Sequence, residues 1–321
     1  MNTALTVLAA LVLLFIAFRS YWLYSRRPRK YTVDFDGKLY RAGENYIAVS
    51  EGDPDTDRSI ICFPGFLEDI RYFMELYREE DCQLIFVNNA AYNFAVDSND
   101  IQELDWEKNP HKVGTIEYDG FHLGLIVQHL ATGSQVVLHG HSRGGAVVLE
   151  AGRQYPNVMK AEGRYIRAIL EAAVLPGGKT VGKGSEPIPF ALICLFLPIV
   201  LGLQRNTSEA KFLQQPMMKP TTPRKTELCM GIYHHPMRYK TCITNVRNIR
   251  NWQRGTDDSV YENYERLDIV IGERDDVLDN DSMIASAERA EVINDGANIL
   301  RTEATNHFVT LERPEYITGL L

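Results

Sequence analysis

Cysteine is scarce in this sequence, and its arrangement excludes one class of protein. The 321 residues include five cysteines, an odd number, and no two of them form a C-x-x-C pair. A disulfide framework needs paired cysteines, so the pattern argues against one and favours a reducing compartment. Cys229, His234, His235 and Cys242 lie close in the sequence. Their spacing matches no common zinc pattern, so a metal site there is the weaker interpretation.

Internal repeats and low-complexity tracts are also absent from the sequence. Hydrophobic residues make up 45% of the chain and charged residues 24%, which is typical of a globular protein and not of a disordered or repeat protein. A length of 321 residues fits one large domain with an insertion, or two domains.

A long apolar run near the start of the chain predicts a membrane helix. Residues 4–24 carry a single charge, at Arg19, and about twenty residues of this kind are enough to span a bilayer. No basic residue precedes the run and no small-x-small cleavage site follows it, so a cleaved signal peptide is the weaker interpretation. We therefore expect residues 1–30 to form a transmembrane signal anchor with a basic juxtamembrane segment. The positive-inside rule then places the main domain in the cytoplasm, because the nearby positive charges are Arg19, Arg26, Arg27, Arg29 and Lys30.

The net charge of −8 is unevenly distributed along the chain. Residues 1–30 carry a net charge of +5 and residues 175–256 carry +9, which leaves −22 on the rest. An acidic body with two basic attachments is the pattern of a protein oriented against an anionic surface. The alternative is that the basic residues of the second segment merely solvate a polar insertion.

Short buried strands alternate with helices through much of the chain. This alternation predicts an α/β fold, with a mostly parallel central sheet and helices on both of its faces. The expected strands of the sheet are residues 59–63, 84–87, 135–138, 166–174, 268–272 and 297–302. The expected helical segments are residues 70–76, 113–131, 143–155 and 281–291. Two further strands, residues 31–35 and 46–49, are expected with Asp36-Gly37 as the turn signal between them.

An insertion interrupts the alternation. We expect a core formed by residues 31–175 and 256–321, and a cap or lid formed by residues 176–255. Ligands of open α/β sheets bind at the carboxyl ends of the strands, so a cap there would cover a site. Residues 188–203 are apolar, which fits either an internal pair of cap helices or a hairpin that dips into the membrane. A spanning helix is excluded, because one crossing would separate the two halves of a single sheet.

A glycine-rich turn follows the strand at residues 135–138. It contains Gly140-His141-Ser142-Arg143-Gly144, a G-x-S-x-G pattern that leads into a helix. In such a strand-to-helix elbow the glycines permit a sharp turn, which raises the serine hydroxyl beside the positive end of the helix. The pentapeptide is common by chance. The rest of the chain must therefore supply a base, an acid and an oxyanion donor.

His307 is the best candidate for the base, because it follows the last expected strand and so emerges at the carboxyl edge of the sheet. A serine nucleophile needs a base within hydrogen-bond reach, and the base needs an acid to fix its tautomer. Asp275 follows the preceding strand and is the expected acid, with Asp276 in reserve. The order Ser142, Asp275, His307 is the Ser…Asp…His order of one class of hydrolase.

Structural or surface roles are expected for other histidines. The geometry of the elbow directs the side chains next to the serine away from its hydroxyl. His141 is therefore interpreted as a residue that only fills space in the turn. His111, His122 and His129 lie on or before an outer helix, where a surface role is expected.

The oxyanion formed on acyl attack needs two N–H donors. The amide of Arg143 is one candidate, because it lies at the first turn of the helix after the nucleophile. The second should come from the loop after the strand at residues 59–63, and the amide of Phe66 in Pro64-Gly65-Phe66 is the expected donor.

The sequence resembles the α/β-hydrolase fold superfamily from about residue 31 to residue 321. It departs from the family pattern at Pro64, where histidine is common, and at Asn306, where glycine often precedes the catalytic histidine. The family's cap is variable and carries the choice of substrate, so the resemblance implies the fold and the chemistry but says little about the substrate. The motifs that carry it are Gly140–Gly144, Phe63-Pro64-Gly65-Phe66, Gly272-x-x-Asp275 and His307-Phe308-x-x-Leu311-Glu312-x-Pro314-Glu315.

The expected protein is a membrane-anchored serine hydrolase of the esterase or lipase kind. Ser142 would attack a carboxylic ester or thioester, His307 would carry the proton, and Asp275 would orient His307. The anchor and the apolar, basic cap indicate a lipid-like acyl substrate, with no metal or organic cofactor and no nucleic-acid partner. One alternative is an acyltransferase that uses the same triad. The other is a catalytically silent binding protein tethered to the membrane.

Overall fold

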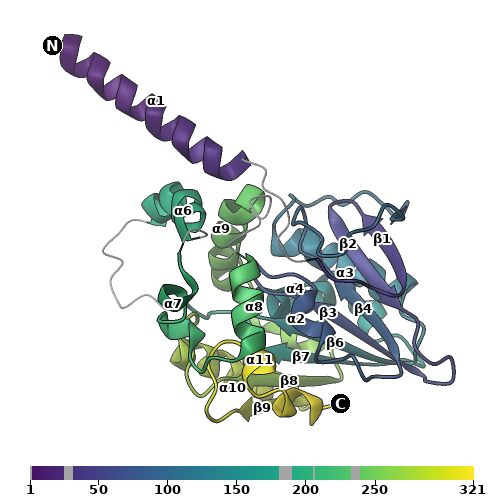
Figure 1. The fold of residues 1–321 in the computed structure, drawn as a ribbon. Coiled ribbons are helices and arrows are strands. Elements are labelled where there is room, and N and C mark those ends of the chain that lie inside the picture. The colour runs from purple at the N-terminus through teal and green to yellow at the C-terminus, as the bar shows by residue number, and fades with distance from the viewer. Residues whose placement is uncertain (1, 25–31, 181–189, 205–206, 233–238) are drawn as a thin grey trace.

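The computed structural model describes residues 2–24, 32–180, 190–204, 207–232 and 239–321. Its centre is a sheet of nine strands in the order β5-β1-β2-β4-β3-β6-β7-β8-β9 (Figure 1). Strand β2 is antiparallel to β1 and β4, and all other neighbouring strands are parallel. The expected fold class, a mostly parallel α/β sheet, is confirmed.

The central strands are the apolar runs of the sequence. Along them the side chains alternate between two buried clusters, with Ile61 and Leu138 in one and Ile60 and Val137 in the other. Both faces of the sheet are covered, which is why these runs are continuously apolar. The central strands are β3 (Arg58–Phe63), β4 (Gln83–Val87), β6 (Gln135–His141), β7 (Tyr165–Glu171) and β8 (Arg266–Ile271). The outer strands are β1 (Lys38–Ala42), β2 (Asn45–Ser50), β5 (Gln102–Glu103) and β9 (Ala297–Arg301).

Helices cover both faces of the sheet, as expected. One set packs into the cluster of Ile61: α3 (Ile116–His129), α4 (Arg143–Gln154), α5 (Pro156–Met159) and α10 (Asn280–Ile293). The other set packs into the cluster of Ile60: α2 (Arg71–Met74), α11 (Val309–Glu312) and α12 (Glu315–Thr318).

The segment between β7 and β8 is mainly helical. It lies to one side of the sheet in Figure 1 and falls largely within the expected cap, residues 176–255. The beginning of the predicted apolar segment 188–203 lies outside the described residues. The elements of this segment are α6 (Phe190–Gln204), α7 (Glu209–Phe212), η1 (Pro216–Met218), α8 (Pro223–Ile232), α9 (Tyr239–Gly255) and η3 (Asp258–Asn263).

One helix among the described residues is long and apolar enough to cross a membrane. This helix is α1 (Asn2–Tyr24), and the apolar stretch within it runs from Thr3 to Leu23. Its N-terminal end points away from the sheet (Figure 1), and its C-terminal half contacts α6. The Phe15 and Phe196 rings are 5.3 Å apart there. The predicted anchor and the apolar part of the insertion therefore lie side by side.

The first strand of the sheet differs from the prediction. The expected strand at residues 31–35 is absent from residues 32–35, and Val33 forms an isolated bridge to Val96. The first strand is instead β1, which pairs with β2 after the Asp36-Gly37 turn signal rather than before it. Residue 31 lies outside the described residues.

The actual turn between β1 and β2 contains Gly43. This glycine has φ +55°, and a Cβ at this position would lie 2.6 Å from the Tyr118 hydroxyl. Strand β1 was not predicted, because this strand carries charged side chains near the edge of the sheet and so lacks an apolar pattern. Arg41, for example, forms an ion pair of 3.2 Å with Glu103 of the edge strand β5.

Candidate active site

Strand β6 runs directly into α4 through the G-x-S-x-G turn. Ser142 has φ +52° and ψ −117°, a strained conformation that costs about 1–3 kcal/mol and must be held by its surroundings. A Cβ on Gly144 would lie 2.0 Å from the Phe63 carbonyl oxygen, and one on Gly140 would lie 2.5 Å from the Gly144 carbonyl oxygen. Both glycines are therefore required by close packing around the serine.

Three predicted site residues lie in one hydrogen-bonded chain. The Oγ atom of Ser142 is 3.0 Å from Nε2 of His307, and Nδ1 of His307 is 2.7 Å from Oδ2 of Asp275. Because a carboxylate accepts from Nδ1–H, Nε2 is left to accept the serine proton. His307 follows β9 and Asp275 follows β8, so the carboxyl ends of neighbouring strands bring the two side chains together.

The two adjacent aspartates have different partners. Burial alone would raise the pKa of Asp275, but His307 and two backbone amides outweigh burial and lower that pKa. The Asp275 carboxyl is therefore ionised at neutral pH. Asp276 instead accepts a hydrogen bond of 2.7 Å from the side chain of Asn306.

The loop after β3 lies against the nucleophile. A Cβ on Gly65 would lie 2.9 Å from the Cβ of Ser142, so this backbone approaches the serine closely. Among the described residues, the amides of Phe66 and Arg143 have no hydrogen-bond partner. The Arg143 side chain is buried in an ion pair of 2.7 Å with Asp119. Two N–H donors beside the serine are what an oxyanion requires.

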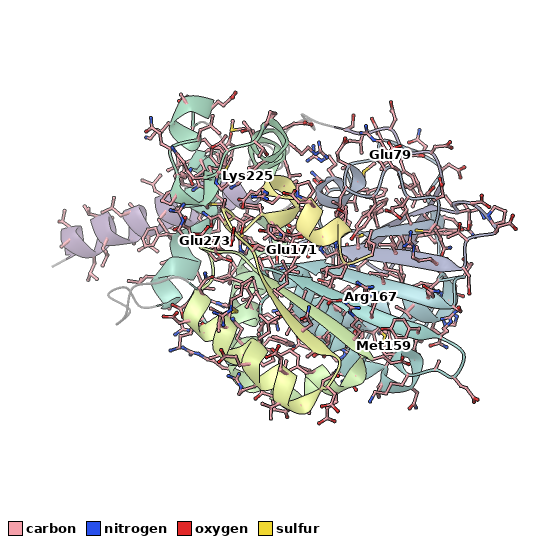
Figure 2. All side chains as sticks on the ribbon, turned by 90° about the horizontal axis from the view of Figure 1, so that it is seen from below. Glu79, Met159, Arg167, Glu171, Lys225 and Glu273 are labelled. Carbon is pink, nitrogen blue, oxygen red and sulfur yellow. The ribbon has the colours of Figure 1, made fainter. Side chains whose placement is uncertain are left out.

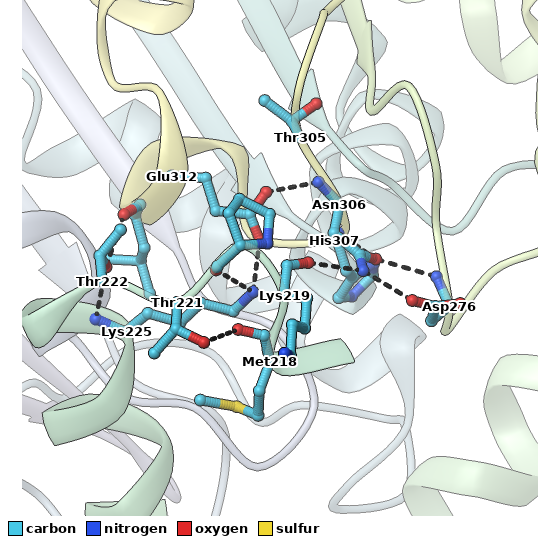
Figure 3. A network of polar contacts seen from close by, with 12 residues as sticks. Met218, Lys219, Thr221, Thr222, Lys225, Asp276, Thr305, Asn306, His307 and Glu312 are labelled. Carbon is cyan, nitrogen blue, oxygen red and sulfur yellow. Dashed lines mark hydrogen bonds and ion pairs between the residues drawn. The ribbon is translucent and has the colours of Figure 1, made fainter. Parts of the chain in front are cut away.

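Asn306 connects the histidine loop to the insertion (Figure 3). Its Nδ2 donates to the carbonyl of Lys219 at 2.9 Å, and its Oδ1 accepts from the amides of His307 and Asp276, both at 2.9 Å. Its own amide donates to Glu312. These contacts explain the departure from the family's glycine, because the asparagine side chain fixes the position of His307 relative to the insertion.

A buried ion pair between Lys225 and Glu312 borders this network (Figure 3). Lys225 comes from α8 of the insertion, and its Nζ also donates to the Pro220 carbonyl at 3.1 Å and lies 5.1 Å from the Phe308 ring centre. Burial lowers the pKa of Lys225 and raises that of Glu312. The insertion is therefore bonded to the segment that carries His307.

A second polar layer lies on the strands below the elbow. Glu171 is fully buried near the centre of the molecule (Figure 2), with its Oε2 3.0 Å from Nε2 of His139. Glu171 also accepts from the Tyr72 hydroxyl at 2.7 Å and from the Thr310 amide at 2.6 Å. Burial would raise the pKa of Glu171, but its hydrogen bonds and the neighbouring histidines lower it to about 2.

His141 is not the filler of the turn that the sequence indicated. It is fully buried, its Nδ1 lies 2.8 Å from Oε2 of Glu68, and its Nε2 donates to the His307 carbonyl at 2.8 Å. Glu68 and Glu171, the partners of the strand histidines, were not predicted from the sequence. The available signal was the spacing of His139 and His141, because residues two apart in a strand share a face.

His122 is not at the surface either. It is 3% exposed, its Nδ1 lies 2.7 Å from Oδ1 of Asn45, and burial lowers its pKa to about 4. The expected outer helix, α3, packs against both α4 and α9, which buries most of its length.

Among the described residues, no group of three or more His, Cys, Asp or Glu side chains could hold a metal ion. Cys229 and Cys242 are buried free thiols. His234 and His235, the other members of the metal grouping considered from the sequence, lie outside the described residues.

Comparisons with known proteins agree with this architecture. The sequence profile of the Alpha/beta hydrolase family matches residues 91–318. A comparison with curated protein sequences returns no match. Among solved structures, the chain is similar to a protein described as a lipase (lip1) from Acinetobacter baumannii AYE, with 14% identity, a TM-score of 0.59, and 96% of this chain and 92% of that chain covered.

Two further solved structures are similar in fold. A protein described as an aryl esterase from Burkholderia cenocepacia has 17% identity and a TM-score of 0.55, with 86% of this chain and 92% of that chain covered. MenH from S. aureus has 14% identity and a TM-score of 0.54, with 85% of this chain and 95% of that chain covered. At these identities the likeness concerns the fold.

A mostly parallel sheet with a serine elbow at the end of a central strand is the architecture of hydrolases of the α/β class. The matched profile covers 228 of the 321 residues, including the positions of Ser142, Asp275 and His307. The chain belongs to the alpha/beta hydrolase family. The resemblance drawn from the motifs is confirmed, and the family membership supports a hydrolase.

Proposed function

We propose that the protein is a membrane-anchored serine hydrolase that cleaves a carboxylic ester or thioester of a lipid-like acyl substrate. The observation that carries this proposal is the chain of contacts from Ser142 Oγ through His307 to Asp275, at 3.0 Å and 2.7 Å. Ser142 attacks the acyl carbonyl while His307 takes the serine proton. The ionised Asp275 stabilises the imidazolium that forms.

The rest of the reaction uses groups of the chain and water. The amides of Phe66 and Arg143 bind the oxyanion of the tetrahedral intermediate. His307 then gives its proton to the leaving alcohol or thiol, and the acyl group remains on Ser142. In the second half His307 deprotonates a water molecule that attacks the acyl-enzyme. His307 then gives this proton to Ser142 Oγ as the carboxylic acid is released.

The lipid-like substrate is supported by the N-terminal helix. Its apolar stretch, Thr3–Leu23, is long enough to cross a bilayer, and the basic residues that follow favour a cytoplasmic hydrolase domain by the positive-inside rule. An enzyme held at that surface meets acyl lipids at high local concentration. The fold neighbours described as an esterase and a lipase agree with ester chemistry.

Acyl transfer is the second candidate, and one observation favours it. Ser142 is 6% exposed and His307 is 3% exposed. Both side chains are therefore largely shielded from bulk water, which would favour an alcohol bound beside them over water as the acceptor of the acyl group.

The test is a series of p-nitrophenyl esters from acetyl to palmitoyl, assayed with the full chain in mixed micelles. We expect kcat/KM to rise with chain length by up to about fourfold per buried methylene, because each contributes about 0.8 kcal/mol. The Ser142→Ala variant gives the blank rate.

Two outcomes contradict parts of the proposal. A preference for the acetyl ester would refute the lipid-like substrate, and turnover equal to that of Ser142→Ala would refute the serine hydrolase. A parallel assay with a long-chain alcohol added separates the two candidates, since transfer yields a new ester in place of the free acid.

A further inference from the structure

Exposed apolar side chains are concentrated on two helices. Among the described residues there are eighteen exposed large hydrophobic side chains, of which ten lie on α1 and five on α6. The other three are Tyr165, Val292 and Ile293. An apolar surface of this extent marks a place where the protein meets another apolar phase. The five residues on α6 are Leu192, Leu195, Phe196, Val200 and Leu203.

Helices α1 and α6 are in direct contact. The Phe15 and Phe196 rings are 5.3 Å apart, and Nε of Arg19 donates to a backbone carbonyl of α6 at 3.0 Å. A Cβ on Gly202 would lie 2.3 Å from the Trp22 ring, so the glycine allows the two helices to approach closely. These contacts place α6 against the C-terminal half of α1.

The contact with α1 determines how deep α6 lies in a bilayer. The 23 residues of α1 make a helix of about 34 Å, against about 30 Å for the hydrocarbon core. Phe15 lies about 12 Å along this helix from Leu23, which is within the half of the bilayer nearer the hydrolase domain. Phe196 contacts Phe15 and so lies at a similar depth. No side chain of α6 carries a charge that would oppose this position.

We propose that α6 is embedded in the membrane leaflet nearer the hydrolase domain, with its exposed apolar face covered by phospholipid acyl chains. This proposal rests on the membrane anchoring in the proposed function. From α6 the chain continues through η1 to Lys219, whose carbonyl accepts from Asn306 beside His307. The insertion therefore contains both the apolar face of α6 and a direct contact with the histidine loop.

The test uses an environment-sensitive NBD fluorophore on single introduced cysteines, with the full chain in phosphatidylcholine–phosphatidylglycerol vesicles. The five native cysteines are buried, so unmodified protein serves as the labelling blank. The positions are Leu192→Cys and Val200→Cys on α6, Leu14→Cys on α1, and the exposed Val292→Cys on α10 as a matched control. We expect a blue-shifted emission at 14, 192 and 200 that loses most of its intensity with doxyl-labelled phospholipid, and no change at 292.

The pattern of quenching separates the possible failures. Quenching at position 14 but not at 192 or 200 would show that α6 faces water or another protein, and would overturn this inference alone. Absence of quenching at all four positions would refute the anchoring, and the inference with it.

A different observation supports a second inference, about the residues that hold the site together. Oε2 of Glu68 lies 2.8 Å from Nδ1 of His141 and accepts from the Gly65 amide at 2.7 Å. Nε2 of His141 lies 2.8 Å from the carbonyl oxygen of His307. The Glu68–His141 pair therefore joins the loops that lie on either side of Ser142.

The partners of His141 determine its charge. A carbonyl oxygen can only accept, so Nε2 carries a hydrogen, and Nδ1 donates to a carboxylate. Burial would lower the pKa of His141, but the carboxylates of Glu68 and Glu171 outweigh burial and raise it to about 9. The Tyr72 ring stacks on this imidazolium at 4.3 Å.

We infer that Glu68 and His141 are positioning residues for the proposed hydrolysis, holding the Phe66 amide and the His307 ring at a fixed spacing across Ser142. Their side chains act through these loops and not on the substrate. Glu68→Gln removes the carboxylate while keeping its size. We expect kcat to fall about 10–100-fold, which is the usual cost when a supporting contact is lost and catalytic groups are misplaced. We expect KM to change less than about twofold, because the pair does not contact the substrate.

The pH profile distinguishes positioning from a loss of folded protein. The charge on His141 is present below pH 9 and is lost as the pH rises through about 9, so wild-type kcat declines there. His141→Gln cannot titrate, so we expect its lower kcat to stay flat across this range. The groups that face His141 are Glu68, Tyr72, His139, Glu171 and His307.

Glu79→Gln, at an exposed position, is the matched control and should behave as the wild type. The inference would be overturned if Glu68→Gln had the same kcat as the wild type. It would also be overturned if the kcat of His141→Gln still declined at alkaline pH. If the wild type hydrolysed no ester faster than Ser142→Ala, the proposed function itself would be contradicted.

Discussion

Ser142→Ala is expected to lower kcat by about four to six orders of magnitude and to abolish labelling by a fluorophosphonate probe. The substitution removes the attacking oxygen and leaves His307 and Asp275 in place. Alanine is smaller than serine and meets the same backbone strain at φ +52°, so the fold should be retained. The measurements are in-gel fluorescence after probe labelling, ester hydrolysis, and circular dichroism of the folded protein.

Two further variants make this prediction specific. Ser208→Ala changes an exposed serine in the insertion and should label as strongly as the wild type. His307→Gln keeps Ser142 but removes its base, so labelling should fall by several orders of magnitude as well. Strong labelling that persists in Ser142→Ala would show that another residue is the nucleophile.

Lys225→Met is expected to lower the free energy of unfolding by about 3–5 kcal/mol. The methionine fills much of the space of the lysine stem but leaves the Glu312 carboxylate buried without its cation, and both side chains are fully buried. Because the Glu312 carboxylate also holds the Asn306 amide, kcat should fall with stability. Urea unfolding followed by tryptophan fluorescence in detergent micelles measures the first effect.

The double variant Lys225→Met/Glu312→Gln provides the decisive comparison. Removing both charges should recover most of the lost stability, because the penalty comes from the unpaired charge and not from the missing lysine. Lys211→Met, at an exposed position, should change stability by less than about 0.5 kcal/mol. Equal losses in the single and double variants would show that the ion pair has no special energetic role.

The sequence predicted the parts of this protein that are encoded locally. The central strands are continuous apolar runs because both faces of the sheet are covered, and the elbow is visible because Gly140 and Gly144 have no room for a Cβ. The order Ser142, Asp275, His307 could be read because each residue follows its own strand, and parallel strands present their carboxyl ends at one edge.

Partners distant in the chain could not be predicted in this way. Glu171 pairs with His139 across two strands, and Lys225 of the insertion pairs with Glu312. Glu171 lies in an expected buried strand and Glu312 in the histidine-loop motif, but nothing in the neighbouring sequence identifies the partner of either glutamate. Strand β1, which lies next to the edge strand β5, was not predicted either, because its charged side chains give no apolar strand pattern.

The long connection between β7 and β8 also has a consequence for how the protein folds. These strands are neighbours in the sheet, yet about 95 residues separate Glu171 from Arg266, and closing such a loop costs about 4 kcal/mol of chain entropy. The strands that precede Phe66 and Ser142, β3 and β6, are joined by shorter connections and can pair first. We therefore expect the half that carries Asp275 and His307 to pair later than the half that carries Ser142, so that the nucleophile acquires its base late in folding.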